Sequence, residues 1–291
     1  MPTAQANGLS ICYETFGKPG DAPLLLVMGL GAQMTMWDPV FCQALASQGF
    51  FVIRFDNRDV GLSSKIEGGP APDFAKAMTG DTSSAAYTLW DMADDAVGLL
   101  DHLGIEGAHI VGASMGGMIV QSMAIRHPRR VLSMTSIMST TGALSVGQAK
   151  PEALGALMAT PPASREEAIE QMVRTFRIIG SPAYPADEAE LRRQAAADYD
   201  RCFHPQGQAR QMVAIIASGD RTAALGKVTT PTLVLHGEAD PLVALSGGEA
   251  TAAAIPGAKL LTFPGVGHDM PRQLLDEFVK AIAENARRAG R

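Results

Sequence analysis

Residues 112–116 read Gly-Ala-Ser-Met-Gly and place Ser114 between two glycines in the pattern G-x-S-x-G. A serine hydroxyl attacks an acyl carbonyl when a neighbouring base takes its proton. The pattern supports this chemistry when it forms a sharp turn from a strand into a helix, because such a turn tolerates no bulk two places either side of the serine. A strand is predicted at His109–Val111 and a helix at Met118–Arg126, so Ser114 is the candidate nucleophile.

His268 and Asp240 are the candidate base and acid of a serine–histidine–aspartate triad, and they follow Ser114 in the chain order acid, then base. Each comes directly after one of the last two predicted strands. Because ligands bind at the carboxyl ends of the strands in open α/β sheets, both side chains are expected at the edge that carries Ser114. Glu238 stays open as an alternative acid. Asp269 adjoins the base in sequence, so its side chain is expected to point away from the imidazole.

Two further histidines lie close enough to these motifs to be weighed. His236 ends the strand before the Asp240 loop, and we interpret it as a packing residue. His204 falls in a helical stretch of the chain and stays open as a substrate contact.

The negative oxygen that forms when a serine attacks a carbonyl requires preorganised N–H donors. One predicted donor is the backbone N–H of Met115, and the other is that of Leu30 in the loop Gly29–Gly31 after an early buried strand. This loop lacks the third glycine of a dinucleotide fingerprint, and no Walker, HExxH or paired CxxC pattern occurs in the sequence. We therefore expect neither a metal nor an organic cofactor.

Composition and charge exclude several classes of partner. The chain has 291 residues, 46% of them apolar and 19% charged, which is typical of a globular protein. Its net charge of -6 and the lack of a basic run argue against nucleic acid or an anionic membrane. The N-terminus does not resemble a signal peptide, the apolar runs are too short to span a bilayer, and three scattered cysteines indicate reduced thiols. We expect a cytoplasmic protein with a small-molecule substrate, and leave a homodimer open.

Short apolar runs alternate with helical patterns, which predicts a mostly parallel sheet flanked by helices. Between residues 142 and 225 this alternation stops, and three helical patterns follow one another with no strand predicted between them. The first begins with the capping box Ser164-x-x-Glu167. We predict one core domain, residues 1–141 and 226–291, with a helical lid, residues 142–225, inserted before the last two strands. The strands are expected at Leu9–Phe16, Leu24–Met28, Phe50–Phe55, His109–Val111, Val131–Ile137, Thr232–His236 and Lys259–Phe263.

Five motifs stand out along the chain, namely Met28–Gly31, Arg54–Gly61, Gly112–Gly116, Gly237–Asp240 and Gly267–His268. Together they resemble the α/β-hydrolase superfamily over nearly the whole chain. The Met-Gly start of the oxyanion loop and the Arg-Asp-x-Gly segment resemble the branch that contains aclacinomycin methylesterase and related small-molecule esterases. Many superfamily members carry His where this chain has Met28. Charged residues crowd Arg54–Ser63, where we predict an internal ion-pair and turn network that fixes the loop, with contact to substrate as the alternative.

The expected activity is that of a carboxylesterase-type serine hydrolase, which cleaves a small hydrophobic ester through an acyl-enzyme. The pocket is expected between sheet and lid, lined by Trp37, Met138, Phe176 and Tyr199. Two alternatives use the same triad, namely carbon–carbon bond hydrolysis of β-diketones and cofactor-free perhydrolysis. A third is a ligand receptor that keeps the triad. Serine at position 114 argues against haloalkane dehalogenases and epoxide hydrolases, whose nucleophile is a carboxylate.

Overall fold

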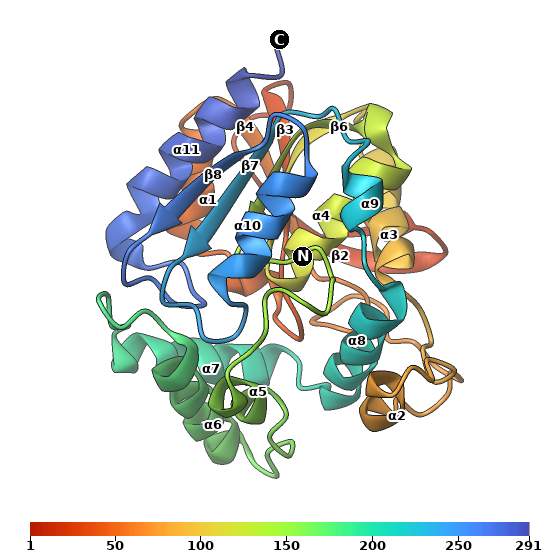
Figure 1. Ribbon diagram of the computed structural model, residues 1–291, viewed down its shortest axis with the longest axis vertical. Helices are drawn as coiled ribbons and strands as arrows, with labels where there is room; N and C mark the ends of the chain where they lie inside the picture. The colour runs from red at the N-terminus through yellow and green to blue at the C-terminus, as the bar shows by residue number, and fades with distance from the viewer. Residues whose placement is uncertain (291) are drawn as a thin grey trace.

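The strands form a single eight-stranded sheet in the computed structural model, which describes residues 1–290 (Figure 1). The strand order is β1-β2-β4-β3-β5-β6-β7-β8, with β1 and β2 antiparallel and all later strands parallel. This arrangement confirms the predicted fold class and brings the carboxyl ends of β3 to β8 to one edge. The strands are β1 (Thr3–Ala6), β2 (Leu9–Phe16), β3 (Ala22–Val27), β4 (Phe50–Phe55), β5 (Ala108–Ala113), β6 (Val131–Ile137), β7 (Thr232–Gly237) and β8 (Lys259–Phe263).

Two hydrophobic clusters cover the two faces of the sheet. Strand β3 contributes Leu25 and Val27 to one cluster and Leu24 and Leu26 to the other, because successive side chains of a strand point to opposite faces. Such a strand is buried on both faces, which is why its sequence is continuously apolar. The first cluster includes α3 (Leu89–His102) and α4 (Met115–Arg126), and the second includes α1 (Pro39–Ala46) and α11 (Leu275–Arg287), preceded by the turn η3 (Arg272–Leu274). Helix α10 (Leu245–Ala254) packs on β7 and β8.

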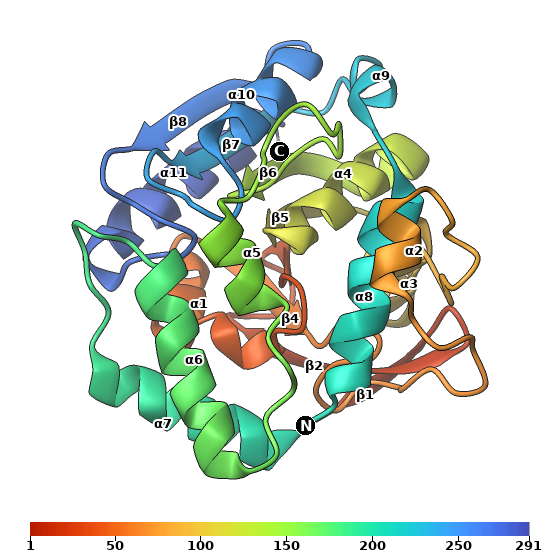
Figure 2. The ribbon, with the colours of Figure 1, turned by 60° about the horizontal axis from the view of Figure 1, so that its bottom comes forward.

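The chain between β6 and β7, all of which the structure describes, forms five helices and no strand. The Ser164 side chain accepts a hydrogen bond from the Glu167 N–H at the start of the second of these helices, where the capping box predicts a helix N-terminus. Figure 2 shows the first four of these helices lying across one end of the sheet, whereas the fifth lies beside α10. They are α5 (Pro151–Leu157), α6 (Arg165–Ile179), α7 (Glu188–Arg201), α8 (Pro205–Ser218) and α9 (Thr222–Leu225).

Arg221 joins the two ends of this inserted segment. Its backbone N–H donates to the Thr141 carbonyl at 2.9 Å, and its guanidinium donates to the Thr140 carbonyl at 3.1 Å and to the Gln121 side chain at 3.2 Å. The guanidinium is almost completely buried, and this burial lowers its pKa to about 10. The segment therefore leaves and re-enters the core at one fixed point.

The structure adds elements that the sequence patterns do not predict. The stretch expected to be a loop, residues 57–84, contains α2 (Phe74–Met78), whose N-terminus is capped by Asp73 and which packs against α8. Strand β1, α5 and α9 are also additional. Each is seven residues or shorter, so none completes enough turns or alternations for periodicity to identify it. No helix of residues 1–290 is long and apolar enough to cross a membrane.

Candidate active site

The turn between β5 and α4 holds Ser114 in a backbone conformation that a serine rarely adopts, with φ 55° and ψ -119°. The glycines on either side permit it. A Cβ atom at Gly112 would lie 2.1 Å from the Gly116 carbonyl oxygen, and one at Gly116 would lie 2.0 Å from the Val27 carbonyl oxygen. The strand, the tight turn and the helix are those predicted around the G-x-S-x-G pattern. Ser114 itself is only half-buried.

The structure brings the three predicted triad residues together at the carboxyl ends of β5, β7 and β8. The Ser114 Oγ lies 3.0 Å from His268 Nε2, and His268 Nδ1 lies 2.7 Å from Asp240 Oδ2. The second oxygen of Asp240 accepts hydrogen bonds from the N–H groups of Leu242 at 2.8 Å and Val243 at 2.9 Å. These bonds fix the buried carboxylate so that its remaining oxygen faces the imidazole. Hydroxyl, imidazole and carboxylate thus form one hydrogen-bonded chain.

The two alternative acids have other partners. Asp269 accepts a hydrogen bond from the Ser181 hydroxyl, and Glu238 accepts one from the Thr262 hydroxyl at 2.8 Å on the exposed side of β8. Burial raises the pKa of Asp269, although the bonds from Ser181 oppose this shift. Asp240 is therefore the acid that the fold places on the Nδ1 atom of His268.

The two other histidines also have structural partners. The His236 Nε2 lies 2.8 Å from the Val243 carbonyl, and burial lowers the pKa of this imidazole, so the neutral ring donates there. The His204 Nε2 lies 3.0 Å from the Arg210 guanidinium. Both rings are engaged within the protein rather than with Ser114.

The predicted oxyanion loop lies directly beside the nucleophile. A Cβ atom at Gly29 would stand 3.1 Å from both the Ser114 Cβ and the Ala113 carbonyl oxygen, so a side chain there would require these neighbours to shift by a few tenths of an ångström. Within residues 1–290, neither the Leu30 N–H nor the Met115 N–H donates to a backbone carbonyl in a turn, a loop or a helix cap. Met115 begins α4, where the first N–H groups of a helix lack internal partners. Both amides are available for the role that the sequence predicts.

Of the four predicted pocket residues, Trp37 requires a correction. Its indole is 1% exposed and stacks on Phe41 in the second hydrophobic cluster, with ring centroids 5.6 Å apart. A side chain sealed to this extent cannot line a cavity that admits substrate. Trp37 directly precedes Asp38, the N-cap of α1, and its indole packs on Phe41 of that helix.

The other three candidates are half-buried, and their contact with a substrate stays a prediction. Met138 follows Ile137, whose carbonyl accepts the Ser114 N–H at 2.9 Å. Phe176 lies one turn of α6 before Ile179, whose carbonyl accepts the His268 N–H at 2.7 Å. Tyr199 stacks on Phe203, with centroids 4.8 Å apart.

The charged segment after β4 forms the internal ion-pair network that the sequence predicts. Each of its charged side chains has a buried or partly buried partner of opposite sign, which leaves none free to bind substrate. The network includes Arg54–Glu14 at 2.5 Å, Asp56–Arg201 at 2.7 Å, Arg58–Asp95 at 2.6 Å and Asp59–Arg210 at 2.8 Å.

Two side chains hold the oxyanion loop, and the sequence motifs include Asn57 but give no sign of Gln211. The Asn57 amide donates to the Met28 carbonyl at 2.9 Å, and the Gln211 amide accepts the Gly31 N–H at 2.8 Å. Gln211 is 180 positions away from its partner, so no local pattern reveals the contact.

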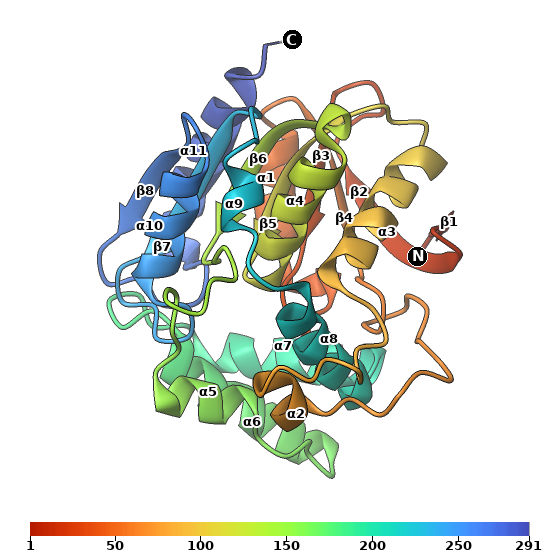
Figure 3. The ribbon, with the colours of Figure 1, turned by 45° about the vertical axis from the view of Figure 1, so that its right-hand side comes forward.

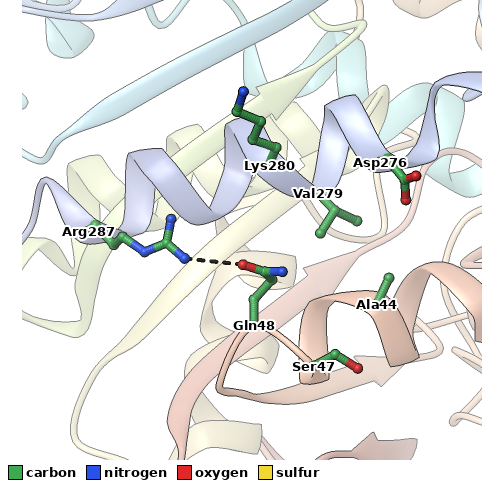
Figure 4. Close-up of a pocket in the computed structure, with 7 residues that line it drawn as sticks. All are labelled: Ala44, Ser47, Gln48, Asp276, Val279, Lys280 and Arg287. Carbon is green, nitrogen blue, oxygen red and sulfur yellow. Dashed lines mark hydrogen bonds between the residues drawn. The ribbon is translucent and has the colours of Figure 1, made fainter.

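Among residues 1–290, no three His, Cys, Asp or Glu side chains cluster in a way that could hold a metal ion. A surface pocket between α1 and α11 is open to solvent near the amino end of β4, and so lies at the edge of the sheet opposite Ser114 (Figure 4). It contains no serine–histidine pair. Its lining residues are Ala44, Ser47, Gln48, Asp276, Val279, Lys280 and Arg287.

The family of the protein follows from a comparison of its sequence with family models. A model described as the alpha/beta hydrolase fold matches residues 22–271, which is most of the chain. The protein therefore belongs to the α/β-hydrolase family. Because its relatives in this family are named esterases, it is an enzyme of the hydrolase class.

Individual relatives indicate which branch of the family the chain is similar to. The chain is 30% identical to rhodomycin D methylesterase DauP of Streptomyces sp. (strain C5) and 29% identical to rhodomycin D methylesterase DnrP of Streptomyces peucetius, over 99% of each chain. The expected resemblance to the methylesterase branch is thereby confirmed. Among solved structures, a meta-cleavage product hydrolase of Pseudomonas fluorescens IP01, CumD, superimposes with a TM-score of 0.79 at 22% identity, covering 100% of this chain and 98% of that one. At this identity the match supports the fold alone.

Proposed function

We propose that the protein is a carboxylic ester hydrolase in which Ser114 is the nucleophile, His268 the general base and Asp240 the residue that orients the base. The observation that carries this proposal is the 3.0 Å separation between Ser114 Oγ and His268 Nε2. This distance lies within the range that a general base needs to take a proton directly.

In the proposed reaction, Ser114 Oγ attacks the ester carbonyl carbon while His268 Nε2 takes the hydroxyl proton. The N–H groups of Leu30 and Met115 donate to the oxyanion of the tetrahedral intermediate. Collapse of the intermediate breaks the bond to the alkoxy group, which leaves as an alcohol with the proton from His268. Water then attacks the acyl-enzyme and gives its proton to His268, and departure of the carboxylic acid restores the serine hydroxyl. Asp240 stabilises the imidazolium that forms in both steps.

The proposed substrate is a methyl ester of a hydrophobic carboxylic acid. Its support is the full-length similarity to two proteins named rhodomycin D methylesterases. We further propose that the inserted helices act as a lid over the triad and that Met138, Phe176 and Tyr199 contact the acyl group. Apolar and aromatic side chains of this kind bind hydrophobic ligands and keep water away.

The test compares methyl, ethyl and butyl esters of one hydrophobic aromatic acid with p-nitrophenyl acetate and butyrate, a β-diketone, and acetate with hydrogen peroxide. We expect many turnovers on the esters, with the highest kcat/KM for the methyl ester. An organophosphate should add to Ser114, which mass spectrometry of the digested protein identifies. Rapid β-diketone cleavage or peracid formation without ester turnover would move the protein to one of the alternative activities. A single turnover followed by arrest would instead indicate a receptor.

A further inference from the structure

We propose that Gln211, on inserted helix α8, is a positioning residue that holds the oxyanion loop so that the Leu30 N–H points at the reacting carbonyl. The inference deepens the proposed function and rests on it. It assigns part of the catalytic geometry to a helix that does not belong to the sheet or to its connecting loops.

The Gln211 side chain is completely buried and both ends of its amide are used. The Oε1 atom accepts the Gly31 N–H at 2.8 Å, and the Nε2 atom donates to the Arg58 carbonyl at 2.9 Å. Rotating the amide by half a turn would set a carbonyl against a carbonyl and an N–H against an N–H. The side chain therefore has one satisfactory orientation, and it ties the oxyanion loop to the turn after β4.

Three consecutive peptide groups of the oxyanion loop are held in this way. The Met28 carbonyl accepts from the Asn57 side chain at 2.9 Å, and the Gly29 carbonyl accepts the Ala32 N–H at 3.3 Å. Gln211 holds the third group through the Gly31 N–H. The Leu30 N–H belongs to the middle peptide, so its direction is set by constraints on both sides. Without Gln211, one side of a glycine-rich loop would lose its anchor.

Close contacts along one face of helix α8 fix its position relative to the oxyanion loop. Gly31 has a φ of 65°, and a Cβ atom there would lie 2.9 Å from the Gln208 side-chain oxygen. A Cβ atom at Gly207 would lie 2.1 Å from the Asp59 carbonyl oxygen, and the Arg210 guanidinium binds both oxygens of the Asp59 carboxylate at 2.8 Å. Figure 3 shows α8 at the end of the sheet with α2 beside it. A helix fixed so closely can transmit a precise position to the loop.

The test is Gln211→Met, which keeps the length of the side chain and removes both hydrogen bonds. Direct loss of one oxyanion donor costs about 10²- to 10³-fold in kcat, so we expect a smaller loss of about 10- to 100-fold from a misplaced donor. KM should stay nearly constant, because the ground-state carbonyl relies little on this donor. Affinity for a trifluoromethyl ketone, which forms a tetrahedral oxyanion on serine, should fall by the same factor as kcat/KM.

Gln121→Met is the matched control. Gln121 is also a completely buried glutamine that bonds to two side chains, Ser136 and Arg221, but it makes no hydrogen bond to the oxyanion loop. We expect a comparable fall in Tm with kcat nearly unchanged. Equal loss of kcat in both variants, or a wild-type kcat in Gln211→Met, would overturn the inference.

Gln211→Glu supplies a second measurement should the methionine variant fold poorly. A protonated glutamic acid reproduces the acceptor and the donor of the amide, whereas a carboxylate opposes the Arg58 carbonyl. The ratio of variant to wild-type kcat should therefore rise as pH falls, and a flat ratio would count against the proposal. Failure of the proposed function is distinguishable, because Ser114→Ala would then retain the wild-type rate.

Discussion

Buried aspartates follow both β7 and β4 at the same edge of the sheet, and they differ in the partner that each carboxylate meets. After β7, Asp240 contacts the His268 imidazole and two backbone N–H groups. After β4, Asp59 binds the Arg210 guanidinium through both oxygens. Two other ion pairs near β4 also join an aspartate to an arginine, namely Asp56–Arg201 and Arg58–Asp95.

The difference in partner separates a catalytic role from a structural one. An arginine stays protonated at all relevant pH values, so a carboxylate paired with it can only hold elements together. A histidine takes up and releases a proton near neutral pH, so a carboxylate paired with it can stabilise the charged form of a general base. We therefore expect substitutions near β7 to change kcat and those near β4 to change stability.

The largest expected effect follows removal of the nucleophile or the base. Ser114→Ala and His268→Ala should each lower kcat by a factor on the order of 10⁶, because the two side chains act as one unit. The double variant should be no slower than either single one. Steady-state kinetics on p-nitrophenyl butyrate, with KM as the check on binding, tests this. Additive losses would contradict a shared step.

Asp240→Asn tests the carboxylate on the catalytic side of the comparison. The asparagine oxygen can still accept the N–H groups of Leu242 and Val243, so the loop should keep its structure. The imidazole loses the acceptor that sets its tautomer, and kcat should fall by about 10⁴-fold. Unfolding by urea should show a stability close to that of the wild type. A large loss of stability with normal kcat would place Asp240 with the structural aspartates.

Asp59→Asn is the matching change on the structural side. It leaves the buried Arg210 guanidinium without its counter-charge, and removal of one partner of such a pair costs about 3–5 kcal/mol. The folded fraction should lose far less kcat than Asp240→Asn does, because the pair acts on the oxyanion loop only through the position of helix α8. Urea unfolding and active-site titration with an organophosphate measure the two quantities separately.

The same pair predicts how stability depends on acid. Burial raises the pKa of Asp59, but hydrogen bonds from Arg210, the Ile66 N–H and Tyr87 outweigh it and hold the pKa below its usual value. The unfolded chain then binds a proton more readily than the folded one. The contribution of Asp59 is complete above the unfolded pKa of about 4 and is lost as pH falls through the lower folded value. Urea unfolding between pH 6 and pH 2, at about one-unit steps, should show a shallower slope for Asp59→Asn.

The smallest effect is expected at Asp269, the aspartate next to the base. Burial raises the pKa of this carboxyl, so the charged form destabilises the folded protein at neutral pH. Asp269→Asn should raise Tm at pH 7, with a gain that shrinks as pH falls through the raised pKa. The kcat should remain within about threefold of wild type, because Asp240 orients the base. A loss as large as that of Asp240→Asn would show that Asp269 shares this role.

Much of the fold and the candidate site is predictable where the signal is local. The strands buried on both faces have continuous apolar sequences, and the glycines at 112 and 116 identify the nucleophile turn because no side chain fits there. The pocket is harder to predict, as Trp37 illustrates. An aromatic residue after the oxyanion loop has the same composition signal whether it lines a cavity or packs on α1.

Residue types and short-range spacing determined the chemistry available to this protein, namely a serine in a strained turn with a histidine and carboxylates on glycine-rich loops. Only the tertiary structure decided which carboxylate meets His268, which arginine neutralises each aspartate after β4, and which glutamine holds the oxyanion loop. Those contacts join residues 28 to 180 positions apart. They depend on the order of the strands and the docking of the inserted helices, which long-range packing sets and no local pattern encodes.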